Sequence, residues 1–294
     1  MEAQTPAGQL MLDAVADLKE WRPGFIPLVA IQLGSGFGEL LEMVTDKNSR
    51  PYMGIPGEIA QVPGFKPVGV SGHAGNLVTG FIGKVPVAVL DGRYHRYEGH
   101  SATEVAHPVR TLVQWGAKIF IATSAVGLAT RDRDFDIGRP VIVTDHINLT
   151  GDDPTAGERD ELFGVTYPDM EKAYDPNLQQ IMVNAFAKLH IRFSEGVLIA
   201  KLGRTYETPA ETRMYGILGA HVGSMSVIHE VIAAHAMGAH ALAIAGPANW
   251  CVGLTPEKIF HNRVVRQIRE MAPDIRDGLQ EAIPLMAAPY IKAA

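Results

Sequence analysis

Short apolar runs, rich in β-branched residues, constrain this chain more than any other feature. They are IPLVAIQLG (26–34), KVPVAVLDG (84–92), AKIFIATSA (117–125), RPVIVTDHI (139–147), EGVLIAKLG (195–203) and HALAIAGPA (240–248). Polar and apolar residues do not alternate within these runs, which is typical of strands that are covered on both faces. Strands of this kind need helices on both sides of their sheet, so the runs predict an α/β protein.

Helix-like segments lie between several of these runs. We expect an amphipathic helix near the N-terminus and helices at 102–115, 176–188, 209–218, 226–237 and 256–282. The alternation of strands and helices predicts a mixed, mainly parallel β-sheet flanked by helices. No linker or break in composition divides the chain, so we expect a single domain over residues 1–294.

Charge, cysteine content and hydropathy argue against several classes of protein. The net charge is -6 and no basic stripe is present, so we expect no nucleic-acid partner. Cys251 is the only cysteine, which excludes an intrachain disulfide and a multi-cysteine metal site and fits a reducing compartment. The N-terminus does not resemble a signal peptide, and no apolar run approaches the ~20 residues of a membrane-spanning helix. We therefore expect a soluble, cytoplasmic protein without a membrane partner.

Small or polar residues follow each predicted strand, in GSGFG, GRYH, TSAVG, DHIN, GRTYE and GPANW. Ligands of open α/β sheets bind beyond the carboxyl ends of the strands, so we expect a site there. In the first of these loops, glycines and the Ser35 hydroxyl could cradle an anion. A tight strand-to-helix turn is an equal alternative for this loop, which matches neither GxGxxG nor GxxxxGK[ST].

The segment LDGRYHRYEGH (90–100) is dense in hydrogen-bonding side chains. Arg93 could hold a phosphate through its planar guanidinium, with His95 as a second donor on the same side of an extended chain. Arg96 would then point the other way, while the roles of Tyr97 and Glu98 stay open. The alternative is a solvated turn with incidental charges.

Two later residues each have a chemical and a structural interpretation. Glu207 could accept hydrogen bonds from a ligand, although periodicity alone favours a helix cap. Asn249 could donate and accept hydrogen bonds or could simply form a turn. The sequence HEVIAAH (229–235) does not predict a zinc site, because six residues turn a helix by roughly 600° and separate the histidines. No GxSxG elbow supports a serine hydrolase.

Together and in this order, GSGFG, GHAGNLVTG, GRYHRYEGH, TSAVG, DHINLTG, YETPAE, VGSMSV and Asn249 resemble the trimeric purine nucleoside phosphorylase family. The resemblance runs from about Ile31 to His261. It implies the nucleoside phosphorylase fold and the phosphorolysis of purine nucleosides, with 6-oxopurines favoured. Inorganic phosphate would be the co-substrate, no cofactor or metal would be needed, and the assembly would be a homotrimer.

The resemblance also implies roles for individual residues. Phosphate would lie among Ser35, His73, Arg93, His95, Ser226 and the backbone at Ala125. The ribose would contact Tyr97, Met225, His261 and Tyr167, with Tyr167 reaching a neighbouring subunit. The base would contact Tyr206, Glu207 and Asn249, and Asn249, Glu207 and His95 would be catalytic.

The sequence departs from the family pattern in three places, TSAVGL (123–128), SMSVIHE (224–230) and GPANW (246–250). These departures favour an altered purine preference first and reduced activity second. Two alternatives therefore stay open, a non-catalytic binder of nucleosides or nucleobases and a nucleoside hydrolase in which water replaces phosphate. A nicotinamide-dependent oxidoreductase is more distant, because GxGxxG is missing.

Overall fold

The computed structural model describes residues 2–52, 61–69, 73–157 and 160–291. Within these ranges one sheet contains β1 (Val29–Gln32), β2 (Thr45–Pro51), β3 (Asn76–Ile82), β4 (Val85–Asp91), β5 (Ile119–Leu128), β6 (Val141–Asn148), β7 (Ser194–Ala200), β8 (Val222–Ser224) and β9 (His240–Trp250). The helices are α1 (Pro6–Trp21), α2 (Ala102–Trp115), α3 (Pro176–Lys188), α4 (Pro209–Ile217), α5 (Ile228–Ala236) and α6 (His261–Ile291). None of these helices is long and apolar enough to cross a membrane.

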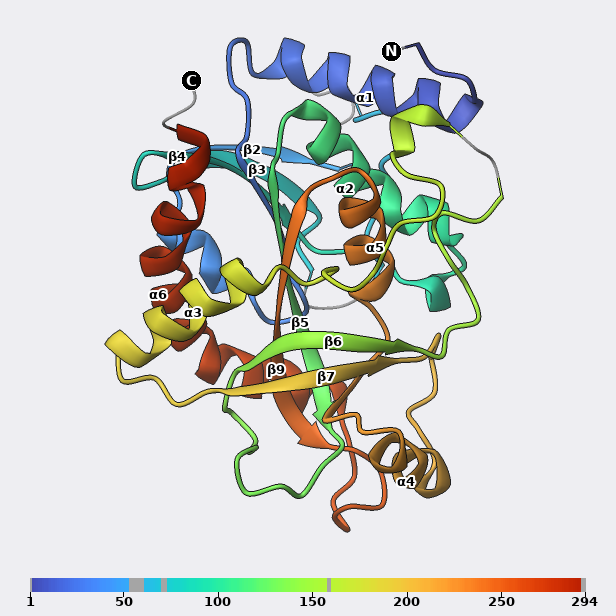
Figure 1. Cartoon of the computed structure of the whole chain (residues 1–294), viewed down its shortest axis with the longest axis vertical. Coiled ribbons are helices and arrows are strands. Elements are labelled where there is room, and N and C mark those ends of the chain that lie inside the picture. Colours follow the sequence, from blue (N-terminus) through green and yellow to red (C-terminus); the bar gives the residue numbers. More distant parts are fainter. Residues whose placement is uncertain (1, 53–60, 70–72, 158–159, 292–294) are drawn as a thin grey trace.

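The strand order is β2-β3-β4-β1-β5-β8-β7-β6-β9, and β9 also pairs with β5. Strands β5, β8, β7, β6 and β9 therefore form a closed circuit, in which β6 and β7 cross β5 and β9 (Figure 1). The pairs β1–β4, β1–β5, β5–β9, β6–β7 and β7–β8 are parallel, and the pairs β2–β3, β3–β4, β5–β8 and β6–β9 are antiparallel. The prediction of a mixed, mainly parallel sheet is confirmed.

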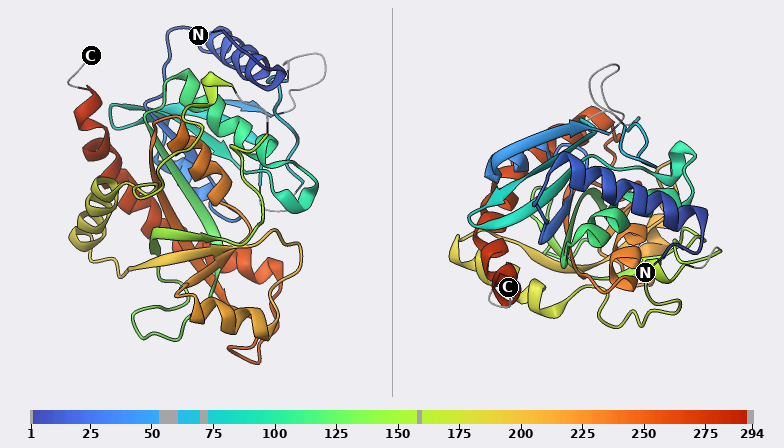
Figure 2. Two further views of the ribbon diagram at one scale, coloured as in Figure 1. Left: turned by 45° about the vertical axis from the view of Figure 1, so that its right-hand side comes forward. Right: turned by 90° about the horizontal axis from the view of Figure 1, so that it is seen from above.

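Helices cover both faces of the sheet, as the unbroken apolar runs predicted. Helices α2 and α5 pack on one face and α3 and α6 on the other (Figures 1 and 2). Leu112 of α2 and Val231 of α5 belong to one apolar core, whereas Phe186 of α3 and Leu279 of α6 belong to the second. Helix α1 is the expected amphipathic helix, and the Thr5 side chain caps its start.

Some elements differ from the sequence predictions for identifiable reasons. The last helix continues past Pro284 to Ile291 because Met286 and Ala287 are buried in the core, and this packing outweighs the loss of a backbone donor. Strand β2 was not predicted, since TDKNSRP is almost entirely exposed and carries no apolar signal. Strands β3 and β8 were also missed, and β8 has only three residues.

Candidate functional site

A cavity of about 430 Å³ lies where the carboxyl ends of several strands meet. Its wall contains every residue proposed for the site except His73 and Tyr167. The lining residues among them are Ser35, Arg93, His95, Tyr97, Ala125, Tyr206, Glu207, Met225, Ser226, Asn249 and His261. We call the part around Ser35, Arg93, His95 and Ser226 the arginine end, and the part around Tyr206, Glu207 and Asn249 the asparagine end.

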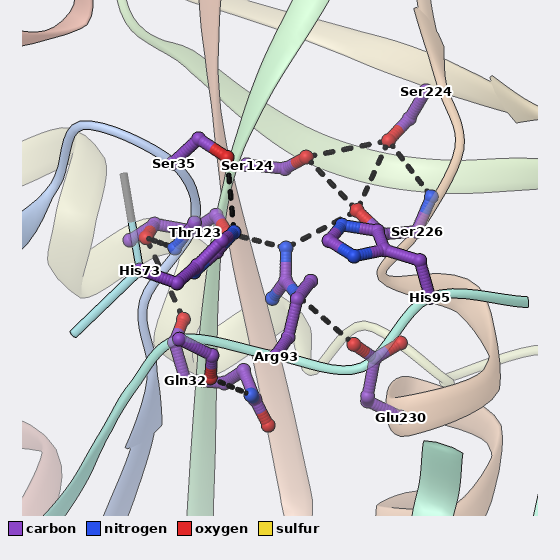
Figure 3. Close-up of polar contacts among 12 residues, drawn as sticks. Gln32, Ser35, His73, Arg93, His95, Thr123, Ser124, Ser224, Ser226 and Glu230 are labelled. Carbon is purple, nitrogen blue, oxygen red and sulfur yellow. Dashed lines mark hydrogen bonds and ion pairs between the residues drawn. The ribbon is translucent and has the colours of Figure 1, made fainter. Parts of the chain in front are cut away.

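Arg93 is the centre of the arginine end and is only 2% exposed (Figure 3). Its Nε lies 3.0 Å from Oε1 of Glu230, and its Nη1 donates to the carbonyl of Thr123 at 2.8 Å and to Oγ of Ser226 at 3.2 Å. Burial lowers the pKa of Arg93, and the Glu230 carboxylate opposes that shift. Nη2 of Arg93 is buried without a hydrogen-bond partner in the described part of the chain, so an anion in the cavity would supply the missing acceptor.

His95 is oriented by Glu98, whose role the sequence left open. Oε2 of Glu98 lies 3.0 Å from Nδ1 of His95 and also accepts the backbone N–H of His95 at 2.9 Å. Burial lowers the pKa of His95, although the hydrogen bond to Glu98 acts in the opposite direction. Tyr97 stacks on the His95 ring at a centroid distance of 4.6 Å. Arg96 points away, as predicted, and pairs with Asp152.

Ser35, in the loop after β1, lies next to His73 at the arginine end. Oγ of Ser35 lies 2.9 Å from Nε2 of His73, so His73 stands behind Ser35 rather than in the cavity wall. Burial, followed by the neighbouring His95 and Arg93, lowers the pKa of His73 to about 3. His73 is therefore neutral at physiological pH and contributes a hydrogen bond rather than a charge.

A strained turn carries Ser226 into the cavity. Val227, the next residue, has a φ of 81°, a left-handed backbone that β-branched residues avoid. Its neighbours hold this conformation in place, because Ser226 contacts Arg93 through its side chain and donates its backbone N–H to Oγ of Ser224. Strain of this kind concentrates at functional sites. Helix α5 begins directly after this turn, so its first residues lie next to Ser226 at the arginine end.

At the asparagine end, Glu207 is not the helix cap that periodicity favoured. Thr208 caps α4 instead, because its side chain accepts the backbone N–H of Glu211. Glu207 is 9% exposed, and its Oε1 accepts the backbone N–H of Val252 at 2.7 Å. The Cys251 thiol also hydrogen-bonds this carboxylate, which keeps further acceptor sites for a donor within the cavity.

A β-bulge places Asn249 in the cavity wall. In the β5–β9 ladder Val126 is opposite Pro247 and Gly127 is opposite Asn249, so Ala248 is the extra residue. Pro247 lies next to the bulge, where the ladder is disrupted and a missing backbone donor is tolerated, and the bulge changes the direction of the side chains that follow. Nδ2 of Asn249 donates to the carbonyl of Trp250 at 2.9 Å, which leaves its second hydrogen for a ligand.

Glu230 is the most important residue that the sequence reasoning did not assign. It is fully buried in α5 and pairs with Arg93. The signal was present, since a carboxylate inside the apolar segment IHEVIAAHA requires a buried cation. Lys201 and Arg204 were also not proposed and line the cavity.

The histidines of HEVIAAH, for which the sequence did not predict a zinc site, have other partners in the structure. Within the described ranges, no cluster of three or more histidine, cysteine or acidic side chains could hold a metal ion. In HEVIAAH, His229 approaches Oγ1 of Thr150, whereas Glu230 is directed to Arg93 and His235 bonds the carbonyl of Asp169.

The cavity thus joins an end lined by a buried guanidinium and serine hydroxyls to an end lined by a carboxylate and an amide. A family model described as the phosphorylase superfamily matches residues 29–283. Purine nucleoside phosphorylase 1 of Geobacillus stearothermophilus is 35% identical over 89% of this chain and 92% of its own length. The purine nucleoside phosphorylase of Mycobacterium tuberculosis is 40% identical over 81% of each chain.

Solved structures agree with these matches. A Schistosoma mansoni purine nucleoside phosphorylase in complex with inosine superposes with a TM-score of 0.85 and 29% identity, covering 94% of this chain and 95% of that chain. The chain therefore belongs to the phosphorylase superfamily, as a divergent member of its purine nucleoside phosphorylases.

Proposed function

We propose that this protein is a purine nucleoside phosphorylase, a pentosyltransferase that cleaves purine nucleosides with inorganic phosphate to give free base and ribose 1-phosphate. The observation that carries the proposal is one cavity with Arg93 and Ser226 at one end and Glu207 and Asn249 at the other. The named relatives support the reaction class.

The proposed chemistry follows from where charge develops. As the glycosidic bond breaks, the sugar becomes cation-like and the departing purine gains negative charge. Asn249 has an unused N–H that would donate to the imidazole-ring nitrogen of the base, stabilising that charge. Glu207 has an unused acceptor for the pyrimidine-ring N–H of a 6-oxopurine, and adenine has no hydrogen at that nitrogen. Tyr206 would pack on the base.

The arginine end would hold phosphate against the cation-like sugar. Arg93 would donate from Nη2, and the Ser35 and Ser226 hydroxyls and the Ala125 backbone would add hydrogen bonds. His95 would contact the phosphate through Nε2, because Nδ1 faces Glu98. Phosphate itself is the nucleophile, so the reaction would need no cofactor. Tyr97, Met225 and His261 would contact the ribose.

We also propose a cytoplasmic homotrimer with sites shared between subunits. Tyr167 lies outside the cavity of its own chain and is 83% exposed, which fits a side chain that reaches a neighbour's ribose. Light scattering on the purified protein would test the assembly, and a monomer would contradict it.

The decisive test is the release of free base from inosine and guanosine by the purified protein, with and without phosphate. A sulfate buffer of equal ionic strength is the control. We expect release only with phosphate. Equal release in both buffers would indicate a hydrolase, and inosine binding without release would indicate a non-catalytic binder.

A further inference from the structure

A cluster of three serine hydroxyls lies beside Arg93, and only Ser226 was proposed as a site residue. Oγ of Ser124 lies 3.2 Å from Oγ of Ser226 and 3.3 Å from Oγ of Ser224, and the last two are 3.4 Å apart (Figure 3). All three side chains are buried and line the cavity. Ser124 and Ser224 are about a hundred residues apart in sequence, and each lies in a segment that departs from the family pattern.

The hydrogens of this serine cluster can be assigned from its surroundings. Oγ of Ser226 accepts from Nη1 of Arg93, and Oγ of Ser224 accepts the backbone N–H of Ser226. Ser124 donates to the carbonyl of Ala125 at 3.2 Å. The Ser124 oxygen can therefore only accept from Ser224 or Ser226, since its own hydrogen is used.

Two arrangements of the remaining hydrogens satisfy the cluster. In one, Ser226 donates to Ser124 and no hydroxyl hydrogen faces the cavity. In the other, Ser224 donates to Ser124, and the Ser226 hydrogen can turn to an anion while its oxygen still accepts from Arg93. The second arrangement leaves none of the three oxygens unsatisfied, which avoids the cost of a buried polar group without a partner.

We propose that Ser224 is a positioning residue that donates to Ser124 and thereby releases the Ser226 hydroxyl hydrogen to a phosphate bound beside Arg93. The proposal rests on the proposed function, because phosphate is the anion concerned. Ser224 acts through Ser226 and therefore affects phosphate rather than nucleoside. Removing Ser224 leaves Ser226 as the only hydroxyl that can donate to Ser124, whereas removing Ser124 takes away the acceptor that competes with phosphate for the Ser226 hydrogen.

The test compares Ser124→Ala, Ser224→Ala, Ser226→Ala and the double variant Ser224→Ala/Ser226→Ala with the wild type. Ser194→Ala is the matched control, because Ser194 is also a buried serine but bonds the carbonyl of Asp134 outside the cavity. We expect Ser224→Ala to raise the phosphate KM roughly 3- to 10-fold, the range of one neutral hydrogen bond. Ser124→Ala should not raise it, because this change removes the acceptor that competes for the Ser226 hydrogen. The inosine KM should stay within about twofold, the scatter expected for sites that do not interact.

The double variant separates positioning from a general structural effect. In the Ser226→Ala background, Ser224→Ala should raise the phosphate KM no further, because both changes remove the same hydrogen bond. A full additional increase, an equal rise in the inosine KM, or an unchanged phosphate KM in Ser224→Ala would overturn the proposal.

Phosphate binding can be measured even if the protein has no phosphorylase activity, so the inference can be tested separately from the proposed function. If the wild type releases no base, calorimetry with inorganic phosphate measures the same variants at equilibrium. Weaker phosphate binding in Ser224→Ala, but not in Ser124→Ala or Ser194→Ala, would support the positioning role without turnover. Identical phosphate affinities would overturn it.

Discussion

The arginine end of the cavity is held by a buried ion pair, whereas the asparagine end is held mainly by backbone groups. Arg93, just after β4, contacts Glu230 of α5, the Thr123 carbonyl of β5 and Ser226. At the other end, Glu207 takes the backbone N–H of Val252 and the Cys251 thiol, and Asn249 donates to the carbonyl of its own neighbour.

This difference between the two ends predicts different effects of substitutions on folding stability and on activity. When a buried ion pair loses one partner, the other charge stays buried without compensation, which is strongly destabilising. A side chain held by one backbone contact can change at little cost to the fold. We therefore expect substitutions in the buried Arg93–Glu230 pair to affect folding and activity together, and those at the asparagine end to affect mainly activity.

The largest expected effect is that of Glu230→Gln. It removes the charge partner of Arg93 inside the protein, so the free energy of unfolding should fall by about 3–5 kcal/mol. Urea denaturation measures the loss. Glu281→Gln is the control, because Glu281 pairs with the exposed Lys188 and its loss should change little. Equal losses of unfolding free energy in Glu230→Gln and Glu281→Gln would show that the buried pair at the arginine end does not stabilise the fold more than a surface pair does.

Asn249→Ala tests the asparagine end, where we expect a loss of activity without a loss of stability. Losing a donor to the developing purine anion should lower kcat for inosine roughly 100- to 1,000-fold. The melting temperature should barely change, since the side chain bonds only the adjacent Trp250 carbonyl among its described contacts. A large fall in melting temperature would show that Asn249 supports the fold as well.

Glu207→Gln should change base preference. Replacing the charged acceptor should lower kcat/KM for inosine by roughly 10- to 100-fold, the range of a hydrogen bond to a charged group, and affect adenosine less. Glu211→Gln, four residues later and in the α4 capping box, is the control. Equal losses for both nucleosides would argue against a contact between Glu207 and the pyrimidine-ring N–H.

The smallest effect concerns pH and His73. Because the folded pKa of about 3 lies below the ordinary value near 6.5, the unfolded chain binds more protons and stability falls as the pH drops below 6.5. His73→Gln should remove about 1–2 kcal/mol of the stability lost between pH 7 and pH 5. Denaturation at both pH values measures this difference. The exposed His190 provides the control variant, His190→Asn, and an identical pH dependence in wild type and His73→Gln would contradict the assignment.

Much of the architecture could be predicted from local pattern. Helices α2 and α3 have the predicted bounds, because their capping residues and apolar periodicity lie within the segments themselves. Polar residues after the strands likewise predicted the place of the cavity. The Glu207 cap was wrong because Thr208, one residue later, offers a hydroxyl with the better geometry.

The sequence by itself determined the α/β class, the position of the site at the strand ends and the residue types available there, since these depend on short-range periodicity and on strand direction. Tertiary structure decided which of those residues meet. The pairing of Arg93 with Glu230, the bulge before Asn249 and the contact between Ser124 and Ser224 each join segments far apart in the chain. No local pattern encodes such contacts, because they arise only when closure of the sheet brings the segments together.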